Sequence, residues 1–482
     1  MIQKQELLDL AKDFGLQPNV VEKDYLLGWL LAGIGAHPAT RDTWVFKGGT
    51  CLKKCFFETY RFSEDLDFTL TDPAHLDEAF LHKLFQEVGD WVYEQTGLVL
   101  PPEARKFEVY TNPRGGTSAE GRVGYRGPLA RAGDAPRIKL DLTDHERLVL
   151  PIDRRSVHHP YSDLPQQGIH VSTYCFEEVF AEKVRALAER LRPRDLYDVV
   201  HLYRRKELSP DLPQLMHALR EKCEFKKIGV PDFASIQASP LIAELQVSWG
   251  QMLAHQLPEL PPFDGFWAEL PDVFDWLHSR VAQPVLAGFA VGADTDTSWR
   301  MPAMASSWRS LGIGAPMEVI RFAAANRLCI QLDYRKVSGE RTQPVIEPYS
   351  LRRTRDGNYL LYGVKADTGE NRSYRVDQIS GATVTQRPFT ARYVVELTET
   401  GIPPVPSVAR PVTATRDVFR APKPSAAKAK GGIGGGPKYT FRCTACGKTF
   451  TRSTYDGALN EHKNKQGYPC FGRFGAFVKT QY

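Results

Sequence analysis

The sequence lacks the features of a membrane or secreted protein. None of its hydrophobic stretches approaches the roughly 18 uninterrupted apolar residues that a membrane-spanning helix needs. The N-terminal segment MIQKQELLDLAKDFGL is an amphipathic pattern with acidic residues and no apolar core, which argues against a secretory signal. No repeat is present at the periods of solenoid proteins. We therefore expect a soluble, cytoplasmic protein with no membrane partner.

Cysteine is scarce and unevenly distributed. The chain has eight cysteines, of which Cys443, Cys446 and Cys470 cluster near the C-terminal end. The other five are scattered through long apolar segments. Scattered thiols with a single tight group are typical of a reducing compartment and a metal site, and they argue against a disulfide framework.

The composition is otherwise that of an ordinary globular protein, with a marked asymmetry of charge. The 482 residues are 42% apolar and 25% charged, which excludes wholesale disorder, and the length suggests about three domains. Residues 410–482 contain 14 Lys and Arg against 3 Asp and Glu, a net charge of +11, so the other residues sum to −6 within the total of +5. A basic tail on an acidic body indicates contact with a polyanion, although a tail that only aids solubility is equally compatible.

Changes of composition predict three folded parts joined by two linkers. Residues 1–287 show alternating helical and strand patterns, and the Gly-, Ala- and Ser-rich residues 288–316 read as a linker. Residues 317–397 predict a β-rich domain, 398–437 a flexible Pro- and Gly-rich linker, and 438–482 a compact cysteine-bearing unit. The predicted strands of the β-rich domain are CIQLDYRK, QPVIEPYSLRR, NYLLYGVKA, NRSYRVDQI and RYVVEL.

The segment TWVFKGGTCLKKCFF predicts a strand, a glycine turn and a helix. In this arrangement the turn Gly48-Gly49-Thr50 opens the helix, whose free N–H groups and dipole favour a phosphate. Glycine is also common in turns without any binding role, so the turn alone is weak evidence of function.

Three aspartates lie on predicted strands downstream of this turn. Asp65 and Asp67 are two residues apart in DLDFTL, so on a strand both carboxylates point to one face. The strand RIKLDLT adds Asp141 amid apolar alternation. Two or three carboxylates beside a phosphate-binding turn provide the oxygen ligands that Mg²⁺ prefers and suit phosphoryl transfer. A pair of aspartates on a strand is otherwise often a solvated edge.

Together these motifs resemble those of the DNA polymerase β-like nucleotidyltransferase superfamily. More narrowly, EKDY at 22–25, KGGT at 47–50, RFSEDLDF at 61–68 and RDLYD at 194–198 are similar to the AbiEii/type IV toxin family. Its members are nucleotidyltransferase toxins of abortive-infection toxin–antitoxin systems, and some transfer nucleotides from an NTP to tRNA 3′ ends. The resemblance covers about residues 15–270.

The resemblance implies a metal-dependent enzyme and assigns roles to particular residues. It implies Asp65 and Asp67 as Mg²⁺ ligands, with Asp141 as the third catalytic carboxylate. It also implies that Lys183 and the Asp195/Asp198 pair bind the triphosphate or close the site. The full set of nucleotide-binding candidates is Lys47, Gly48, Gly49, Thr50, Arg61, Ser63, Lys183, Asp195 and Asp198.

The residues on the predicted helix 173–191 also allow other roles. Lys183 and Arg190 share one helical face and could both reach a triphosphate, but a surface helix with paired charges would show the same pattern. Asp195, just after Pro193, could equally be a first-turn acid that the helix dipole favours.

Residues nearer the N-terminus are similarly ambiguous. Arg61 could reach a phosphate or pair with Glu64. Glu22 and Asp24 are secondary candidates by resemblance, or ordinary acids on a helix surface.

Residues 317–397 resemble a WYL domain, a small SH3-like β-rich module of bacterial regulators. The matching pieces are IQLDY at 330–334, EPYSLR at 347–352 and RSYRVDQI at 372–379, while the tryptophan of the name-giving triplet is Asn358 here. WYL modules are thought to bind ligands or nucleic acid, and this departure leaves ligand binding open. The tyrosines of this module, Tyr334, Tyr359 and Tyr362, are expected to be core aromatics rather than a base-stacking platform. Its arginines form either a basic face or a set of solvated strand residues: Arg352, Arg353, Arg355, Arg372 and Arg375.

The C-terminal unit predicts a zinc site. Cys443-x2-Cys446 resembles a zinc knuckle, and His462 and Cys470 complete four ligands for tetrahedral Zn²⁺. A unit of about 45 residues buries too little core to fold without such a staple, although three free cysteines and an incidental histidine would give the same pattern. Basic and aromatic residues around the site favour nucleic-acid binding: Lys438, Arg442, Lys448, Arg452, Lys463, Lys465, Arg473, Tyr439, Phe441, Phe450, Tyr455 and Phe471.

We therefore predict an α+β protein: a polymerase β-like nucleotidyltransferase core with a helical C-terminal part, a WYL-type module and a zinc-stapled basic unit. The predicted activity is Mg²⁺-dependent transfer of nucleotides from an NTP to an RNA acceptor such as tRNA, as a toxin of a type IV toxin–antitoxin or phage-defence system. The expected partners are RNA, DNA through the basic tail, and a cognate antitoxin. The alternative is a nucleic-acid-binding regulator with a degenerate transferase scaffold.

Overall fold

The computed structural model describes residues 1–111, 115–130, 133–205, 208–283, 285–296, 298–299, 301, 316–398, 438–443, 446–452, 459–460, 462–463, 469–470 and 475–481. The chain forms two compact units, Met1–Arg420 and Ala421–Tyr482. Within the predicted linkers, residues 302–315 and 399–437 lie outside the described residues. The mixture of helices and strands confirms the predicted α+β class. In the ranges described, no helix is long and apolar enough to cross a membrane.

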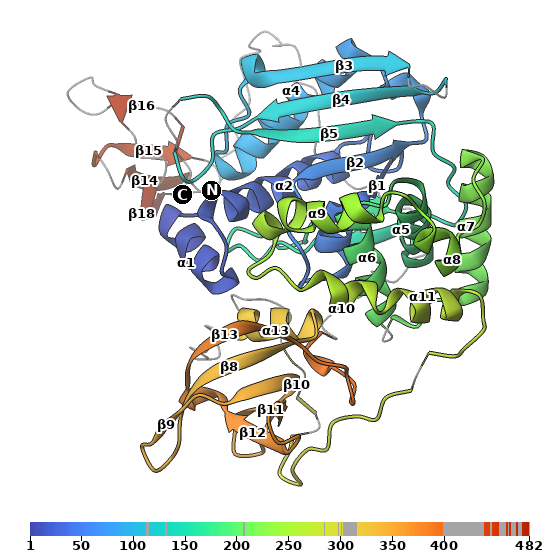
Figure 1. Ribbon diagram of the computed structural model, residues 1–482. Coiled ribbons are helices and arrows are strands. Elements are labelled where there is room, and N and C mark those ends of the chain that lie inside the picture. Colours follow the sequence, from blue (N-terminus) through green and yellow to red (C-terminus); the bar gives the residue numbers. More distant parts are fainter. Residues whose placement is uncertain are drawn as a thin grey trace. The chain divides into compact units, whose positions relative to one another are not determined.

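A seven-stranded sheet organises the first unit (Figure 1). Its strand order is β3-β4-β5-β2-β1-β7-β6, with β2 antiparallel to β1 and parallel to β5. The strands predicted from DLDFTL and RIKLDLT are confirmed as β2 and β5. The bounds are β1 (Trp44–Lys47), β2 (Asp65–Leu70), β3 (Arg105–Thr111), β4 (Thr117–Gly124), β5 (Arg137–Thr143), β6 (Asp153–Ser156) and β7 (His170–Thr173).

One face of this sheet is apolar and packs against two long helices, α2 (Pro18–Ala36) and α4 (Glu78–Thr96). The ring of Phe85 on α4 lies 6.3 Å from that of Trp44 and 5.1 Å from that of Phe107, centroid to centroid. Helix α2 is apolar on nearly every side and is largely buried, as expected of a central helix. Because strand residues alternate between faces, the polar residues of β2 and β5 all point away from these helices.

A set of helices completes the part of the first unit that precedes the β-rich module. The predicted helix 173–191 is confirmed as α5 (Phe176–Arg190), and α6 (Pro193–Arg204) begins with a proline at its first position, where no N–H is needed. Helix α7 packs along α5, and α9 and α10 pack on α6. The other bounds are α1 (Lys4–Phe14), α7 (Leu212–Lys226), α8 (Phe233–Gln237), α9 (Ile242–Leu253), α10 (Phe263–Trp267) and α11 (Leu270–Leu277).

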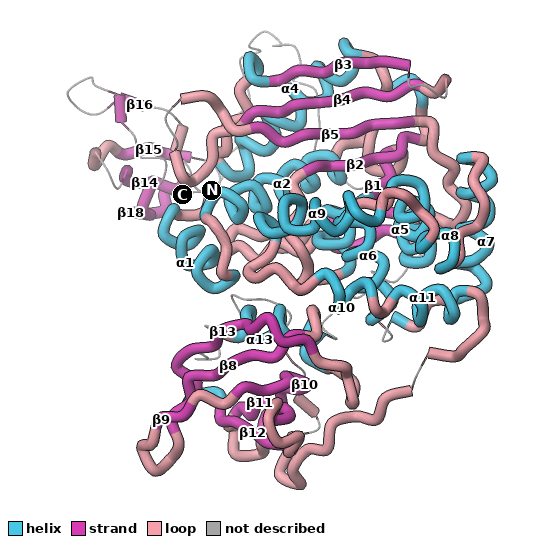
Figure 2. The backbone as a smooth tube through the Cα atoms, in the orientation of Figure 1, coloured by secondary structure: helices cyan, strands magenta, loops and turns pink. Residues whose placement is uncertain are grey.

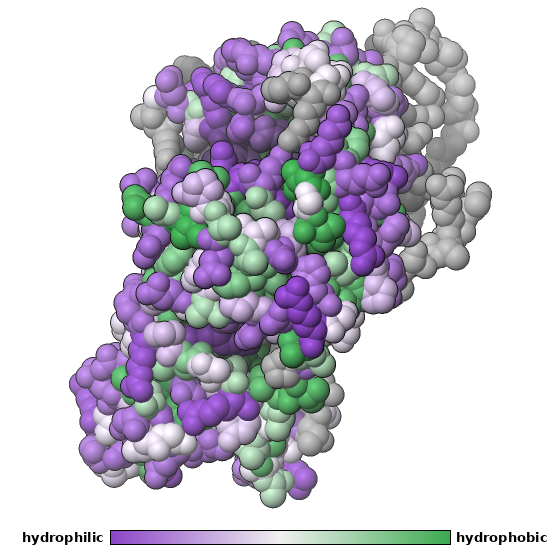
Figure 3. All heavy atoms as spheres, turned by 45° about the vertical axis from the view of Figure 1, so that its right-hand side comes forward, coloured by the Kyte–Doolittle hydropathy of each residue, from purple (hydrophilic) through white to green (hydrophobic). Residues whose placement is uncertain are grey.

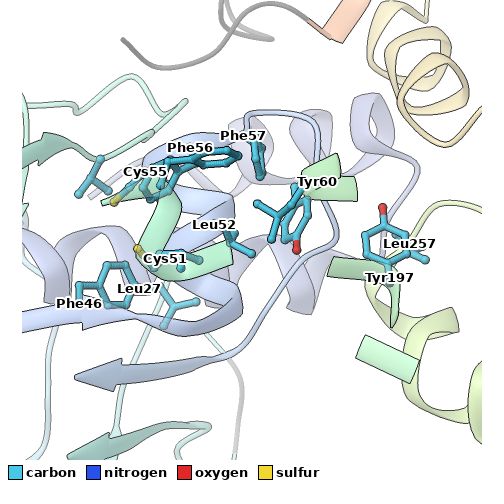
Figure 4. Close-up of a cluster of buried hydrophobic side chains, with 14 of the residues drawn as sticks. Leu27, Phe46, Cys51, Leu52, Cys55, Phe56, Phe57, Tyr60, Tyr197 and Leu257 are labelled. Carbon is cyan, nitrogen blue, oxygen red and sulfur yellow. The ribbon is translucent and has the colours of Figure 1, made fainter. Parts of the chain in front are cut away.

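The core continues beneath the predicted glycine turn. There the chain runs from α3 (Gly48–Cys51) into one turn of π-helix, Leu52–Phe56. The run LKKCFF places Leu52, Cys55 and Phe56 in this core beside Phe46 and Tyr60 (Figure 4). The turn therefore rests on a fully packed support.

The β-rich module follows in the same unit (Figure 2). Helix α13 (Met317–Ala325) precedes a sheet of order β12-β11-β10-β8-β13, with β9 paired to β8. Four of the five predicted strand runs are confirmed, and their bounds are β8 (Leu328–Arg335), β9 (Arg341–Thr342), β10 (Val345–Arg353), β11 (Tyr359–Lys365), β12 (Asn371–Arg375) and β13 (Ile379–Pro388).

The strand predicted from RYVVEL is wrong. Residues 392–397 hold an isolated bridge at Tyr393 and part of a 3-10 turn, Glu396–Thr398. Val395 and Leu397 are buried, so their apolar character reflects packing rather than pairing. The strand at this edge of the sheet is β13 instead. Its Gly, Ser and Thr residues give no apolar strand pattern, because an edge strand needs little apolar surface.

The second unit is a small β structure. Strands β15 (Thr449–Arg452), β14 (Lys438–Cys443) and β18 (Gly475–Gln481) form one sheet, and β16 (His462–Lys463) pairs with β17 (Pro469–Cys470). Phe441 is buried, with its ring centroid 5.9 Å from that of Phe477. Because this core is so small, much of the stability of this unit would have to come from a metal held by its cysteines and histidine.

Candidate active site

The three predicted carboxylates lie on the polar face of the seven-stranded sheet. Asp67 on β2 pairs in register with Lys47 on β1 and with Asp141 on β5. Asp65, two residues before Asp67, points to the same face and pairs with Lys139. The sequence prediction that these aspartates converge is thus matched by their placement.

The electrostatics of the site fit a bound cation. Burial raises the pKa of Asp67 to about 6, and the neighbouring charge of Asp141 adds to the rise, while Lys47 and Lys183 oppose it only in part. Burial likewise raises the pKa of Asp65. The charge of Asp141 thus raises the pKa of both Asp65 and Asp67, a cation between these groups would relieve that repulsion, and oxygen ligands of this kind suit a divalent metal.

The glycines of the turn are required by close approach. Gly48 has φ +79°, and a Cβ atom there would lie 2.2 Å from Oδ2 of Asp67. A Cβ atom on Gly49 would lie 2.4 Å from a guanidinium nitrogen of Arg61. Thr50 donates a hydrogen bond from its hydroxyl to the backbone carbonyl of Asp65. The turn is thereby fixed against the strand that carries the carboxylates, because only glycine tolerates these contacts.

Asp198 is fully buried and holds Lys183 in place. It accepts hydrogen bonds from Lys183 Nζ at 2.8 Å, from Arg61 Nε at 2.7 Å and Nη2 at 2.8 Å, and from the hydroxyl of Tyr60. Burial alone would raise the pKa of Asp198, but Arg61 and Lys183 hold it below its ordinary value. In this structure Asp198 therefore contacts the cations rather than an open cavity.

Arg61 does not pair with Glu64, and its contact with a phosphate stays a prediction. It is buried, contacts Asp198, and donates from Nη1 to Oε1 of Gln256 at 2.9 Å. Glu64 instead pairs with Lys23 at 2.6 Å. No local pattern predicts this arrangement, since Arg61 and Asp198 are 137 residues apart.

Asp195 is a buried first-turn acid of α6 and forms two hydrogen bonds with Arg190, at 2.7 and 2.8 Å. Ser63 is half-buried in the segment before β2. The alternative of a surface helix does not hold for α5, because Lys183 and several of its other charged residues are buried. The functional roles of these residues stay predictions.

The interpretation of Glu22 and Asp24 as surface acids is wrong. Both are buried on α2. Asp24 pairs with the buried Lys54 at 2.6 Å, and Glu22 accepts a hydrogen bond from the backbone N–H of Leu129 at 2.7 Å. Buried charges need such partners, so both residues stabilise the fold behind the site.

A cavity of about 430 Å³ opens beside the carboxylates. Lys47 lies in its wall, and burial would lower the pKa of this lysine, but Glu182 and Glu146 raise it overall. Sequence reasoning missed the residues that β3, β4 and α7 bring to this wall, since only strand register and helix packing place them there. The lining residues are Lys47, Asp67, Tyr110, Ser118, Ala119, Asp141, Leu142, Thr143, His145, Glu146 and Lys226.

Three of the five arginines considered as a basic face of the β-rich module have acidic partners. Arg352 pairs with Glu396, Arg372 with Glu370 and Arg375 with Asp377. Its tyrosines serve the fold. Tyr362 is buried, and the hydroxyl of Tyr334 donates to Gln378 at 2.7 Å. Tyr359 lies against Trp299, with ring centroids 5.5 Å apart. These contacts support the interpretation as core and strand aromatics.

The C-terminal unit brings its four predicted metal ligands together. The ligand atoms of Cys443, Cys446, His462 and Cys470 all lie within 4.8 Å of one another. The Sγ atoms of Cys443 and Cys470 are 3.8 Å apart, which matches the ~3.8 Å that two Zn–S bonds of about 2.3 Å at a tetrahedral angle would give. The residues therefore fit a tetrahedral metal. Tyr455, Lys465, Phe471 and Arg473 lie outside the described residues.

Comparisons with known proteins match two parts of the chain. Residues 29–278 match the family model described as nucleotidyl transferase AbiEii toxin, type IV TA system, and residues 316–384 match the WYL domain. One similar solved structure is MenT4, a nucleotidyltransferase toxin from Mycobacterium tuberculosis H37Rv, with 18% identity over 58% of this chain and 90% of that chain and a TM-score of 0.39. Another is the proteasome accessory factor B/C of Arthrobacter aurescens, with 14% identity over 30% of this chain and 21% of that chain and a TM-score of 0.14. No protein with a curated description matches.

Proposed function

Because the chain belongs to the AbiEii family of nucleotidyl transferase toxins of type IV toxin–antitoxin systems, it is a nucleotidyltransferase, and we propose that it transfers nucleotides from an NTP to an RNA acceptor such as tRNA. The observation that carries this proposal is the convergence of Asp65, Asp67 and Asp141 on one sheet face beside a cavity of about 430 Å³. The family implies a divalent metal, which we propose to be Mg²⁺. By the same analogy, the enzyme would act in phage defence under control of a cognate antitoxin.

The three carboxylates would hold the metal, and the cavity would hold the NTP. Bound there, Mg²⁺ would offset the charge of the triphosphate as pyrophosphate leaves. Asp141, on the sheet side of the cavity, would help to activate the acceptor hydroxyl. Lys183 lies near enough to lower the pKa of Asp67, and from there it would hold a phosphate. Since Asp198 fixes the ammonium group of Lys183, the cation would be in place before the NTP binds.

The rest of the chain would serve acceptor binding. WYL domains suggest nucleic-acid binding, and the four clustered ligands of the C-terminal unit would hold Zn²⁺. The tail carries a net charge of +11 on residues 410–482, so phosphate contacts would dominate its affinity for RNA or DNA. Its zinc would keep this basic surface folded.

Incubation of the full chain with each labelled NTP, Mg²⁺ and total RNA tests the proposal. We expect the wild-type protein to label RNA with at least one NTP, and Asp65→Asn and Asp67→Asn to lose at least 100-fold of that rate without unfolding. If RNA stays unlabelled while the protein still binds it, the alternative of a regulator on a degenerate scaffold replaces the proposal. If the Asn variants label RNA at the wild-type rate, the site is misassigned.

A further inference from the structure

The polar face of the seven-stranded sheet carries its charges in rows that run across the strands. Lys106 on β3 pairs in register with Arg122 on β4, Arg122 with Lys139 on β5, and Lys139 with Asp65 on β2. Residues in register on neighbouring strands point to the same face, about 4.8 Å apart from strand to strand. The three cations therefore form a basic row about 10 Å long that ends at Asp65.

The next two rows lie on the same face of the sheet, progressively further from the basic row. Two residues along the strands, Asp141 and Asp67 pair in register. Two residues further, Tyr110 pairs with Ser118, and Ser118 with Thr143. These residues line the cavity beside the carboxylates, whereas Lys106, Arg122 and Lys139 do not. The carboxylates thus separate the cavity from the basic row.

The basic row is open to solvent. The side chains of Lys106, Arg122 and Lys139 are 65%, 52% and 40% exposed. In Figure 1 helix α4 lies behind β3, β4 and β5, and no helix drawn there crosses the front of these strands among the described residues. Figure 3 shows hydrophilic side chains gathered over this upper part of the molecule. Arg137, two residues before Lys139 on β5, adds a fourth exposed cation to the same face.

We propose that this basic row binds the backbone phosphates of the nucleic-acid acceptor and leads its end to Asp65 and Asp67, while the NTP occupies the cavity on the other side. The proposal rests on the proposed function and identifies where its second substrate lies. It accounts for two access routes to one set of carboxylates, which a transfer between two polyanionic substrates requires. Because the row spans three β-strands, it would contact several phosphates of a flexible nucleic-acid chain at once.

The acidic neighbours of the row do not block it. Lys106 pairs with Glu108, Arg122 with Glu120 at 2.7 Å, and Lys139 with Asp141 at 3.1 Å. Exposed ion pairs of this kind are weak, so a phosphate can replace the carboxylate as partner. A cation bound at Asp141 would also take away the nearer of the two partners of Lys139, the other being Glu120 at 3.5 Å.

The test compares the double variant Lys106→Gln/Arg122→Gln with a control of equal charge change, Arg280→Gln/Lys336→Gln. Both control residues are exposed and have one acidic partner each, Asp275 and Glu340, and they lie outside the sheet. Binding of the full chain to a labelled single-stranded RNA and to a DNA of the same sequence is measured between 0.05 and 0.3 M salt. The KM for acceptor and for NTP is measured in parallel.

Loss of two phosphate contacts should reduce the slope of log K against log salt by about 1.4 for a single strand, which corresponds to about tenfold weaker binding near 0.15 M salt. The KM for acceptor should rise by a similar factor and that for NTP by less than twofold, while the control stays at wild-type values. RNA and DNA should lose affinity by similar factors, because the proposed contacts are to phosphates that both carry.

The inference is overturned if the sheet variant and the control lose equal affinity, or if neither changes the slope. Both outcomes leave the proposed function intact whenever wild-type protein still labels RNA. Absence of labelling by the wild-type protein refutes the proposed function, whereas the binding slopes still decide whether the row contacts phosphates. A charge-retaining variant, Lys106→Arg/Arg122→Lys, should keep wild-type affinity, and its failure to do so would point to altered folding of β3 and β4.

Discussion

Asp67→Asn should stabilise the metal-free protein while it abolishes nucleotide transfer. The pKa of Asp67 is raised from an ordinary 3.8 to about 6, first by burial and then by Asp141. At 1.36 kcal/mol for each pH unit, this difference corresponds to about 3 kcal/mol of free energy of unfolding. The folded state is penalised when the group is charged, so this cost is small below pH 4, grows as the pH rises, and is complete above about pH 7. Asparagine has nearly the same volume and carries no charge, so it avoids the cost.

Thermal unfolding at pH 4 to 8 without added metal measures this effect. All eight tryptophans lie in residues 29–308, so their fluorescence reports on the first unit and not on the zinc-binding tail. The variant should match the wild type near pH 4 and exceed it by several degrees at pH 8. Added Mg²⁺ should raise the midpoint of the wild type and leave that of the variant nearly unchanged, because only a site that binds the ion gains stability from it.

Asp356→Asn, in an exposed turn of the β-rich module, is the matched control and should show no such pH dependence. The reasoning is refuted if Asp67→Asn is less stable than the wild type at pH 8, or if its advantage does not depend on pH. A gain in stability with full activity would instead show that Asp67 is strained without being a metal ligand.

Three further predictions concern the supports of the site and the tail. Asp198→Asn should cost about 3–5 kcal/mol of stability because it leaves two buried cations without their shared partner, whereas Asp195→Asn should cost less, since Arg190 is 48% exposed; denaturant titration compares the two. Lys183→Ala should weaken NTP binding at least tenfold and RNA binding by less than twofold, measured by calorimetry with each ligand, and equal losses would return this lysine to a structural role. Cys443→Ser or chelation of zinc should lower RNA affinity and the salt slope as deletion of 410–482 does, and metal analysis that finds no zinc would contradict the Cys–His site.

Local sequence patterns predicted the elements that carry the carboxylates. Alternation with period two in residues 65–70 and 137–143 fixes which residues share a face, and that is enough to place Asp65 and Asp67 together. The meeting of Asp67 with Asp141 depends on parallel pairing of strands 74 residues apart, which no local pattern encodes. There the prediction relied on resemblance to a family.

The partners of buried charges could not be predicted in the same way. Glu64 is an acidic residue close to Arg61 in its own segment, but the partner of Arg61, Asp198, lies on α6. In the sequence, Glu22 and Asp24 are polar residues of a helical pattern, as surface acids would be. Their burial by surrounding elements, which the pattern does not show, gives them a role in stabilising the fold. The edge strand β13 was missed for the opposite reason, because its polar residues reflect exposure rather than a loop.

One such buried pair joins the two family domains within the first compact unit. Arg321 on α13 of the β-rich module contacts Glu58 at 3.0 Å and Glu318 at 3.1 Å, and both Arg321 and Glu58 are almost completely buried. Burial raises the pKa of Glu58 to about 7 even against the charge of Arg321, so neither group is well accommodated without the other. Glu58 lies three residues before Arg61, which fixes Asp198 and through it Lys183. The segment that supports the candidate active site therefore also anchors the WYL module, and the two domains share one structural support.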